Sequence, residues 1–167
     1  MIIYEEVFKE FQKHKINYVL VGGLAFNLLG GMRATSDLDI LVAMTDDNLR
    51  KIVKILKNKG YGVKQPVDPM DIANESLRKD WIKNKNMKAF NFYKDDGIHE
   101  VDIIIDSPVS FYKAKKNAII ISVGKLKLPV ISVDDLITMK KRAGRDIDRL
   151  DINQLMEIKK YRKKYAL

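Results

Sequence analysis

The sequence predicts an α/β (α+β) fold in which helices flank a mixed, partly antiparallel sheet. Segments with helical and with strand patterning alternate along the chain, and Asp95-Asp96-Gly97 between two β-prone segments is a strong signal for an antiparallel hairpin. The chain has 167 residues, of which 46% are hydrophobic, and no Pro/Ser-rich linker divides it. We therefore expect one domain over residues 1–167, large enough to bury a core.

The N-terminal half is expected to contain four helices and two strands. The expected helices cover residues 4–14, 24–29, 45–60 and 75–85, and the expected strands cover 17–21 and 37–43. Thr45 can cap the helix that follows it, and Gly60 ends that helix. Residues 65–70 include Pro66 and Pro69 and are expected to form a loop.

The C-terminal half is expected to continue the sheet and then to end in helices. The expected strands cover residues 88–93, 98–105, 118–123 and 125–130. From Ser132 the chain is expected to be helical, because Ser132 and Asp135 form a capping box before an apolar face, and Gly144 interrupts this helix. We assign the core to about residues 1–131 and the C-terminal helices to about residues 132–164.

Two aspartates separated by one residue, Asp37 and Asp39, begin the second expected strand, and a Gly22-Gly23 pair closes the first. Alternate side chains of a strand share a face, so both carboxylates can share hard divalent cations such as Mg²⁺, two of which can clamp an in-line displacement at phosphorus. The glycine pair has no Cβ atoms, so its backbone N–H groups can approach an anion closely. The segment predicts a pocket for metal and phosphate.

Asp102 is a candidate third carboxylate. It lies within an apolar strand, where its desolvation favours a metal or a cationic partner. Glu100 and Asp106 share its face by parity and remain competitors, although Asp106 is better explained as a strand-end residue. Trp81 and His99 are expected to be packing residues, because neither belongs to a cluster of suitable chemistry.

Charge and composition limit the expected partners. The formal net charge is +9, and Lys and Arg are concentrated in the last thirty or so residues. Such a basic segment favours anionic partners, such as a nucleoside triphosphate or a nucleic acid. A solvated, lysine-rich helix face explains the same pattern. The absence of cysteine excludes disulfides, thiolate metal sites and a cysteine nucleophile. No segment is expected to enter a membrane, and we expect a cytoplasmic protein.

Several segments together resemble the DNA polymerase β-type nucleotidyltransferase superfamily, particularly its small stand-alone prokaryotic members. The resemblance rests on Gly22-Gly23, on Asp37-Leu38-Asp39-Ile40 and on Val101-Asp102-Ile103. Much of the remaining chain is also similar to the subgroup that includes type IV abortive-infection toxins, although residues 65–86 carry no such resemblance. The resemblance implies a nucleotidyltransferase-like fold and transfer of a nucleoside monophosphate from a nucleoside triphosphate to an acceptor hydroxyl, with release of pyrophosphate.

The resemblance also implies roles for the residues of these motifs. Asp37 and Asp39 would bind both of two Mg²⁺ ions. Asp102 would ligate the catalytic ion and help to deprotonate the acceptor hydroxyl, while Gly22 and Gly23 would hold the triphosphate.

Polar residues outside the motifs are further candidates. In the subgroup a Lys, an Arg and spaced aspartates recur in the last helices; by that resemblance Lys140 and Arg145 would contact phosphate or acceptor, with Asp148 as an alternative base. An exposed i,i+3 ion pair explains Arg145 and Asp148 equally well. Arg33 is compatible both with a turn residue and with a phosphate contact.

The glycine pair departs from the superfamily pattern at one point. Many members have Gly-Ser where this chain has Gly22-Gly23, so a hydroxyl contact to the triphosphate is missing here. Thr35 or Ser36 is a candidate to replace it.

Other functions share the Asp-x-Asp pattern. In haloacid dehalogenase-type phosphatases the aspartates end an apolar strand, whereas here polar residues precede Asp37 and apolar residues follow Asp39. The alternatives are a glycosyltransferase that uses nucleotide sugars and a catalytically silent nucleotide- or partner-binding regulator, such as one component of a toxin–antitoxin pair. For a transferase, an RNA terminus such as that of a tRNA suits the basic tail, while a protein hydroxyl or an antibiotic is also compatible.

Overall fold

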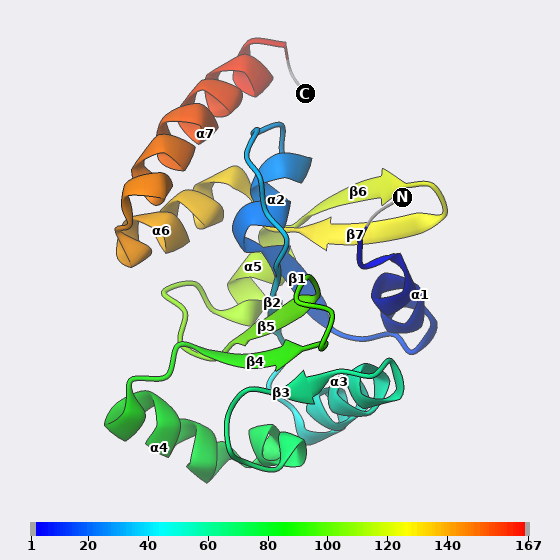
Figure 1. Cartoon of the computed structure of the whole chain (residues 1–167). Coiled ribbons are helices and arrows are strands. Elements are labelled where there is room, and N and C mark those ends of the chain that lie inside the picture. Colours follow the sequence, from blue (N-terminus) through cyan, green and yellow to red (C-terminus); the bar gives the residue numbers. More distant parts are fainter. Residues whose placement is uncertain (1–2, 166–167) are drawn as a thin grey trace.

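One seven-stranded mixed sheet forms the centre of the computed structural model, which describes residues 3–165 (Figure 1). Its strand order is β3-β4-β5-β2-β1-β7-β6. Neighbouring strands are antiparallel except in the pairs β1–β7 and β2–β5, which are parallel. The predicted α/β class with a mixed, partly antiparallel sheet is therefore confirmed. The strands are β1 (Tyr18–Val21), β2 (Leu38–Val42), β3 (Gly62–Val63), β4 (Ala89–Tyr93), β5 (Glu100–Ile104), β6 (Ile119–Val123) and β7 (Leu126–Val130).

Helices surround this sheet (Figure 1). They are α1 (Glu5–Lys13), α2 (Gly22–Leu28), α3 (Asp46–Asn58), the 3-10 helix η1 (Pro69–Ala73), α4 (Glu75–Lys85), α5 (Phe111–Asn117), α6 (Val133–Ala143) and α7 (Asp146–Tyr165). Helix α2 packs against β1 and β2, α1 packs against α3 and β7, and α6 and α7 lie side by side. In the described part of the chain, no helix combines the length and the apolar character that a membrane crossing requires.

Sequence patterning missed three short elements. Helix α5 has one buried residue, Ala114, and three lysines, so its apolar periodicity is weak; its start is marked by Ser110, whose hydroxyl accepts the N–H of Lys113 at 3.2 Å. The expected loop over 65–70 leads into η1. Strand β3 has two residues, too few for a sequence period to be visible.

The predicted caps are confirmed. Thr45 accepts the N–H of Asn48 at the start of α3, and Ser132 accepts the N–H of Asp135 at 3.2 Å at the start of α6. Gly144, with φ of +66°, ends α6 in the left-handed conformation, so the C-terminal segment is two helices that turn against each other.

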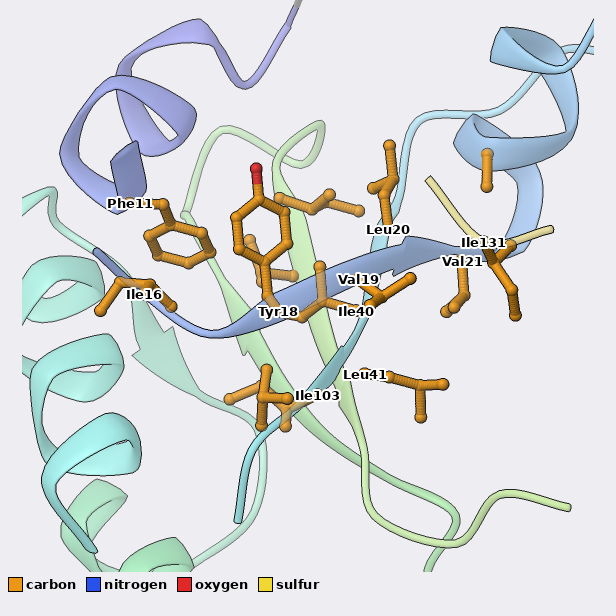
Figure 2. Close-up of a cluster of buried hydrophobic side chains, with 14 of the residues drawn as sticks. Phe11, Ile16, Tyr18, Val19, Leu20, Val21, Ile40, Leu41, Ile103 and Ile131 are labelled. Atoms are coloured by element: carbon orange, nitrogen blue, oxygen red, sulfur yellow. The ribbon is translucent and has the colours of Figure 1, made fainter. Parts of the chain in front are cut away.

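The hydrophobic core lies around β1, all four residues of which are buried. Figure 2 shows Phe11 and Ile16 next to Tyr18 at one end of this strand, with the rings of Phe11 and Tyr18 5.2 Å apart. Trp81 stacks on Phe90 with ring centroids 5.4 Å apart, which confirms its packing role. Because one core cluster joins residues from α1 to α7, we propose that the chain forms a single domain; its division near residue 131 stays a prediction.

Candidate functional site

Polar side chains gather on one face of the sheet because four strands are in register. Val21 of β1 is paired with Asp39 of β2, Asp39 with Asp102 of β5, and Asp102 with Asn91 of β4. The residues on either side of Asp39 and Asp102 are buried. Alternation along the strands therefore sends apolar neighbours into the core and leaves both carboxylates on the opposite face. The sequence placed Asp39 and Asp102 correctly on two strands, and the sheet makes these strands neighbours.

The glycine pair lies directly beside this row. Gly22 follows Val21 and has φ of +68°, a conformation that L-residues rarely adopt, and a Cβ atom there would overlap the carboxylate of Asp39. A Cβ atom on Gly23 would lie 2.5 Å from Oγ1 of Thr35. The backbone therefore passes closer to the carboxylate than any side-chain-bearing residue would allow.

The segment that enters β2 brings the hydroxyl candidates to the same place. The hydroxyl of Thr35 faces Gly23, whereas Ser36 is exposed and its hydroxyl donates to Oδ1 of Asp37 at 2.9 Å. Asp37 itself precedes β2 and is half-buried. Thr35 is thus the hydroxyl that lies against the glycine pair, and Ser36 orients Asp37.

Burial and neighbouring carboxylates raise the pKa values of Asp39 and Asp102. Burial, followed by the charges of Asp102 and Asp37, raises the pKa of Asp39 to about 7, and a backbone hydrogen bond from Gly23 and the charge of Arg145 partly offset this. The pKa of Asp102 is also raised, mainly by burial, while a hydrogen bond from the Asn91 amide at 2.7 Å lowers it. Desolvated carboxylates that repel one another favour a proton or a cation as partner.

The expected three-carboxylate cage is not preassembled. Within residues 3–165, no three His, Cys, Asp or Glu side chains are already gathered closely enough to hold a metal ion. Two of the carboxylates are instead engaged by neighbouring side chains: Asp37 accepts the hydroxyl of Ser36, and Asp102 accepts the amide of Asn91. Paired positions on neighbouring strands lie about 5 Å apart, so side-chain rotation alone can bring Asp39 and Asp102 onto one ion. Two desolvated carboxylates fit a hard divalent cation such as Mg²⁺.

The contribution of Asp39 to the stability of the metal-free protein should therefore fall as the pH rises from about 4 to 7. Below that range Asp39 is protonated in both states; within it the unfolded chain ionises first, because the folded pKa is raised, and the loss is complete above about pH 7. Urea unfolding in EDTA should show Asp39→Asn to be more stable than the wild type by roughly 2 kcal/mol at pH 8, and by clearly less at pH 5.

Magnesium supplies the control for this measurement. At pH 8 it should raise the stability of the wild type, since it binds the folded state, and leave Asp39→Asn unchanged. Equal stability of the two proteins at both pH values would contradict the assignment.

The C-terminal candidates divide into buried and exposed groups. Arg145 has a side chain that is 66% exposed, and its charge acts on Asp39. Lys140 is buried, and its Nζ lies 2.6 Å from Oδ2 of Asp151. The structure thus places Lys140 in an internal ion pair, and its predicted contact with phosphate or acceptor stays a prediction.

Asp148 is also buried and paired. Its side chain is fully buried, and Arg145 donates to it from Nε at 2.7 Å and from Nη2 at 3.1 Å. The pKa of Asp148 is lowered by these hydrogen bonds against the opposing effect of burial. A carboxyl group that is occupied by an arginine and holds its proton weakly is poorly suited to act as a general base. The structure favours a role as the partner of Arg145, and the alternative base stays a prediction.

Arg33 has features of both predicted roles, that of a turn residue and that of a phosphate contact. Its Nη1 donates to Oδ2 of Asp151 at 2.8 Å, and its Nη2 would lie 3.3 Å from a Cβ atom on Gly23. The backbone of Arg33 is held by the side chain of Asn27 at 3.2 and 2.9 Å. Arg33 therefore belongs to a fixed turn and also reaches the glycine pair.

Three supporting residues were not predicted. Asn91 donates to Asp102 and is itself fixed by Gln65, whose amide donates to Oδ1 of Asn91 at 2.6 Å. The buried hydroxyl of Tyr4 lies 2.5 Å from the carbonyl oxygen of Ser36 and 2.8 Å from that of Glu100, which ties the entry of β2 to the start of β5. Asn91 could have been found from the sequence, because it is a polar residue between Phe90 and Phe92 in an expected strand. No local sequence feature indicates the roles of Tyr4 and Gln65.

The competing carboxylates are occupied elsewhere. Glu100 accepts Nζ of Lys64 at 2.7 Å, and Asp106, beyond the end of β5, accepts Lys88 at 2.6 Å and Arg142 at 2.7 Å. His99 contacts the ring of Tyr4 edge-on and the carboxylate of Asp96, in agreement with a packing role.

Solved structures of nucleotidyltransferases share the fold of this mixed sheet. The chain is similar to the lincosamide antibiotic adenylyltransferase LnuA bound to lincomycin, with 17% identity, a TM-score of 0.63 and coverage of 93% of this chain and 96% of that one. It is also similar to ANT(2'')-Ia in complex with adenylyl-2''-tobramycin, with 12% identity, a TM-score of 0.58 and coverage of 98% and 95%. A third similar structure, an antigenic nucleotidyltransferase-like protein from Paracoccidioides brasiliensis, has 16% identity, a TM-score of 0.55 and coverage of 93% and 73%.

At these identities the structural likeness establishes the fold. A family model described as a nucleotidyltransferase of unknown function (DUF6036) matches residues 2–161. The chain therefore belongs to this nucleotidyltransferase family. No curated protein matches its sequence significantly.

Proposed function

We propose that this nucleotidyltransferase is Mg²⁺-dependent and transfers a nucleoside monophosphate from a nucleoside triphosphate to the hydroxyl group of an RNA. The observation that supports the metal-dependent chemistry is the pairing of Asp39 with Asp102 across β2 and β5, next to the Gly22 turn. Bound Mg²⁺ would neutralise the carboxylates and polarise the phosphates.

The residues of the chain have distinct parts in this reaction. The backbone at Gly22-Gly23 and the Thr35 hydroxyl beside it would face the triphosphate, and the guanidinium of Arg145, whose charge acts on Asp39, would contact its phosphates. Asp102 is placed to accept the proton of the acceptor hydroxyl, whose oxygen forms a bond to the α-phosphorus while the bond from that phosphorus to pyrophosphate breaks. The Asn91 amide keeps Asp102 turned toward the sheet face.

Helix α7 supports RNA as the acceptor. It begins beside Arg145 and carries exposed Lys160, Lys163 and Lys164 in its second half. The neighbouring rings of Tyr161 and Tyr165 are also exposed, with centroids 4.5 Å apart. Basic side chains alternating with exposed aromatic rings suit a phosphate backbone and unpaired bases, whereas this positive surface suits a cationic antibiotic less well.

Labelled transfer tests this proposal directly. Each α-labelled nucleoside triphosphate is incubated with the protein, Mg²⁺ and total cellular RNA, and we expect at least one of them to label RNA and to release pyrophosphate. The double variant Lys163→Glu/Lys164→Glu should raise the KM for RNA by about tenfold or more at moderate salt, with a smaller effect at high salt. RNA labelling is measured on gels over a range of salt concentrations.

The matched control is Lys54→Glu/Lys57→Glu, which makes the same charge change on exposed positions of α3. Its KM for RNA should stay within about twofold of the wild type. If an aminoglycoside or a lincosamide were labelled and RNA were not, the proposed RNA acceptor would be wrong and the antibiotic would be the acceptor. Triphosphate binding without transfer to any acceptor would favour the catalytically silent regulator, including a toxin–antitoxin component.

A further inference from the structure

Two arginines at the site are each held by a carboxylate of α7. The first is Arg145, in the turn before α7, which makes three hydrogen bonds to Asp148: Nε at 2.7 Å, Nη2 at 3.1 Å and the backbone N–H at 3.2 Å. Asp148 is fully buried while the arginine side chain is largely exposed. The guanidinium group thus has one fixed edge and one edge open to solvent, within electrostatic range of Asp39.

The second is Arg33, in the segment between α2 and β2. Its Nη1 donates to Oδ2 of Asp151 at 2.8 Å, and its other terminal nitrogen lies next to Gly23. Asp151 is buried, whereas the side chain of Arg33 is 21% exposed. This ion pair therefore links Arg33 to Asp151, more than a hundred positions away in the sequence, next to the Gly22-Gly23 turn.

The two carboxylates act as one unit. Asp148 and Asp151 lie three residues apart on α7, and such residues are neighbours on a helix surface. The buried ammonium of Lys140 lies between them, 2.6 Å from Oδ2 of Asp151 and 3.5 Å from Oδ1 of Asp148. The five groups carry three positive and two negative charges, which leaves a net charge of +1 beside the site.

We propose that Asp148 and Asp151 are positioning residues that hold Arg145 and Arg33 as a two-arginine clamp for the triphosphate, with Lys140 as their buried counter-ion. The proposal rests on the proposed nucleotidyl transfer. A free arginine loses side-chain entropy when it is fixed, so an arginine already held by a buried carboxylate binds phosphate at lower cost. The bidentate contact with Asp148 also directs the open edge of Arg145, while Arg33 is held to Asp151 by one hydrogen bond through Nη1.

Substitution of the two carboxylates tests the clamp. Asp148→Asn and Asp151→Asn should each raise the KM for the nucleoside triphosphate, and the Kd for inorganic tripolyphosphate by calorimetry, by at least about tenfold. The kcat should stay within a few-fold of the wild type. A purely structural role would instead reduce the active fraction, and so kcat, with KM unchanged. The matched control is Asp146→Asn on the same helix, an almost fully exposed aspartate, which should change neither constant.

Two further measurements keep the test decisive. If a buried variant fails to fold, Arg145→Lys retains the charge but not the fork to Asp148, and should show the same rise in KM and Kd. In ¹⁵N NMR the Arg145 Nε–H resonance should be protected in the wild type and in Asp151→Asn, and lost in Asp148→Asn.

The outcomes separate the clamp from the reaction. Unchanged KM and Kd in Asp148→Asn and Asp151→Asn, in a wild type that transfers nucleotide, would overturn the clamp alone. A wild type that binds tripolyphosphate through these residues yet transfers nothing would overturn the proposed function alone. A wild type that binds neither tripolyphosphate nor nucleoside triphosphate would overturn both.

Discussion

Replacing Asp39 by asparagine should lower nucleotidyl transfer by about a thousandfold or more while the protein remains folded. Asp39 is paired with Asp102 across two strands and has a raised pKa, so a cation shared by the two carboxylates would be its natural partner in the active state. An amide of the same shape removes the charge and the second ligand oxygen. The measurement is single-turnover transfer from a labelled triphosphate at saturating Mg²⁺.

The same variant separates catalysis from folding. Asp39→Asn is expected to be more stable than the wild type at pH 8 without metal, so lost transfer cannot be assigned to unfolding. Asp106→Asn serves as the control, because Asp106 lies just beyond β5 and is engaged by Lys88 and Arg142. Asp106→Asn should transfer nucleotide at a rate within a few-fold of the wild type. Full activity of Asp39→Asn would show that the Asp39–Asp102 pair is not needed for the reaction.

Substituting alanine for Gly22 should both destabilise the protein, by about 2–4 kcal/mol, and abolish transfer. A φ of +68° costs an L-residue roughly 1–2 kcal/mol. The new Cβ would also overlap the carboxylate of Asp39, so that either the turn or the aspartate has to move. Urea unfolding and the transfer assay measure the two effects.

Gly97 provides a control for the backbone part of this effect. It has φ of +69°, and a Cβ atom there would meet nothing within 4 Å. Gly97→Ala should therefore show the backbone cost of about 1–2 kcal/mol and keep its activity. If Gly22→Ala reduced stability and transfer no more than Gly97→Ala does, the close approach of Gly22 to Asp39 would not be needed for function.

Local chemistry explains what the sequence could predict. The Asp95-Asp96-Gly97 turn gave the β4–β5 hairpin, and Thr45 and Ser132 gave two helix starts, because turns and caps depend on residues close in the chain. The alternation of apolar and polar residues put Asp39 and Asp102 on the open face of their strands. Each of these features is encoded within about ten residues.

The remaining features depend on partners far apart in the sequence. The resemblance presented Lys140 and Asp148 as candidates for direct chemistry, but only the packing of α6 against α7 shows that both are buried and paired. The contact of Arg33 with Asp151 and the hydrogen bonds of Tyr4 likewise join distant segments. No local pattern marks such pairs.

The contact between Thr35 and Gly23 has a consequence for how this protein can evolve. The threonine hydroxyl fills the space that a side chain at residue 23 would need, 2.5 Å from the position of its Cβ atom. A serine at position 23 therefore requires Thr35 to move or to be replaced by a smaller residue. We expect substitutions at the two positions to be coupled, so that a Gly-Ser version of the turn is better tolerated once position 35 has become smaller.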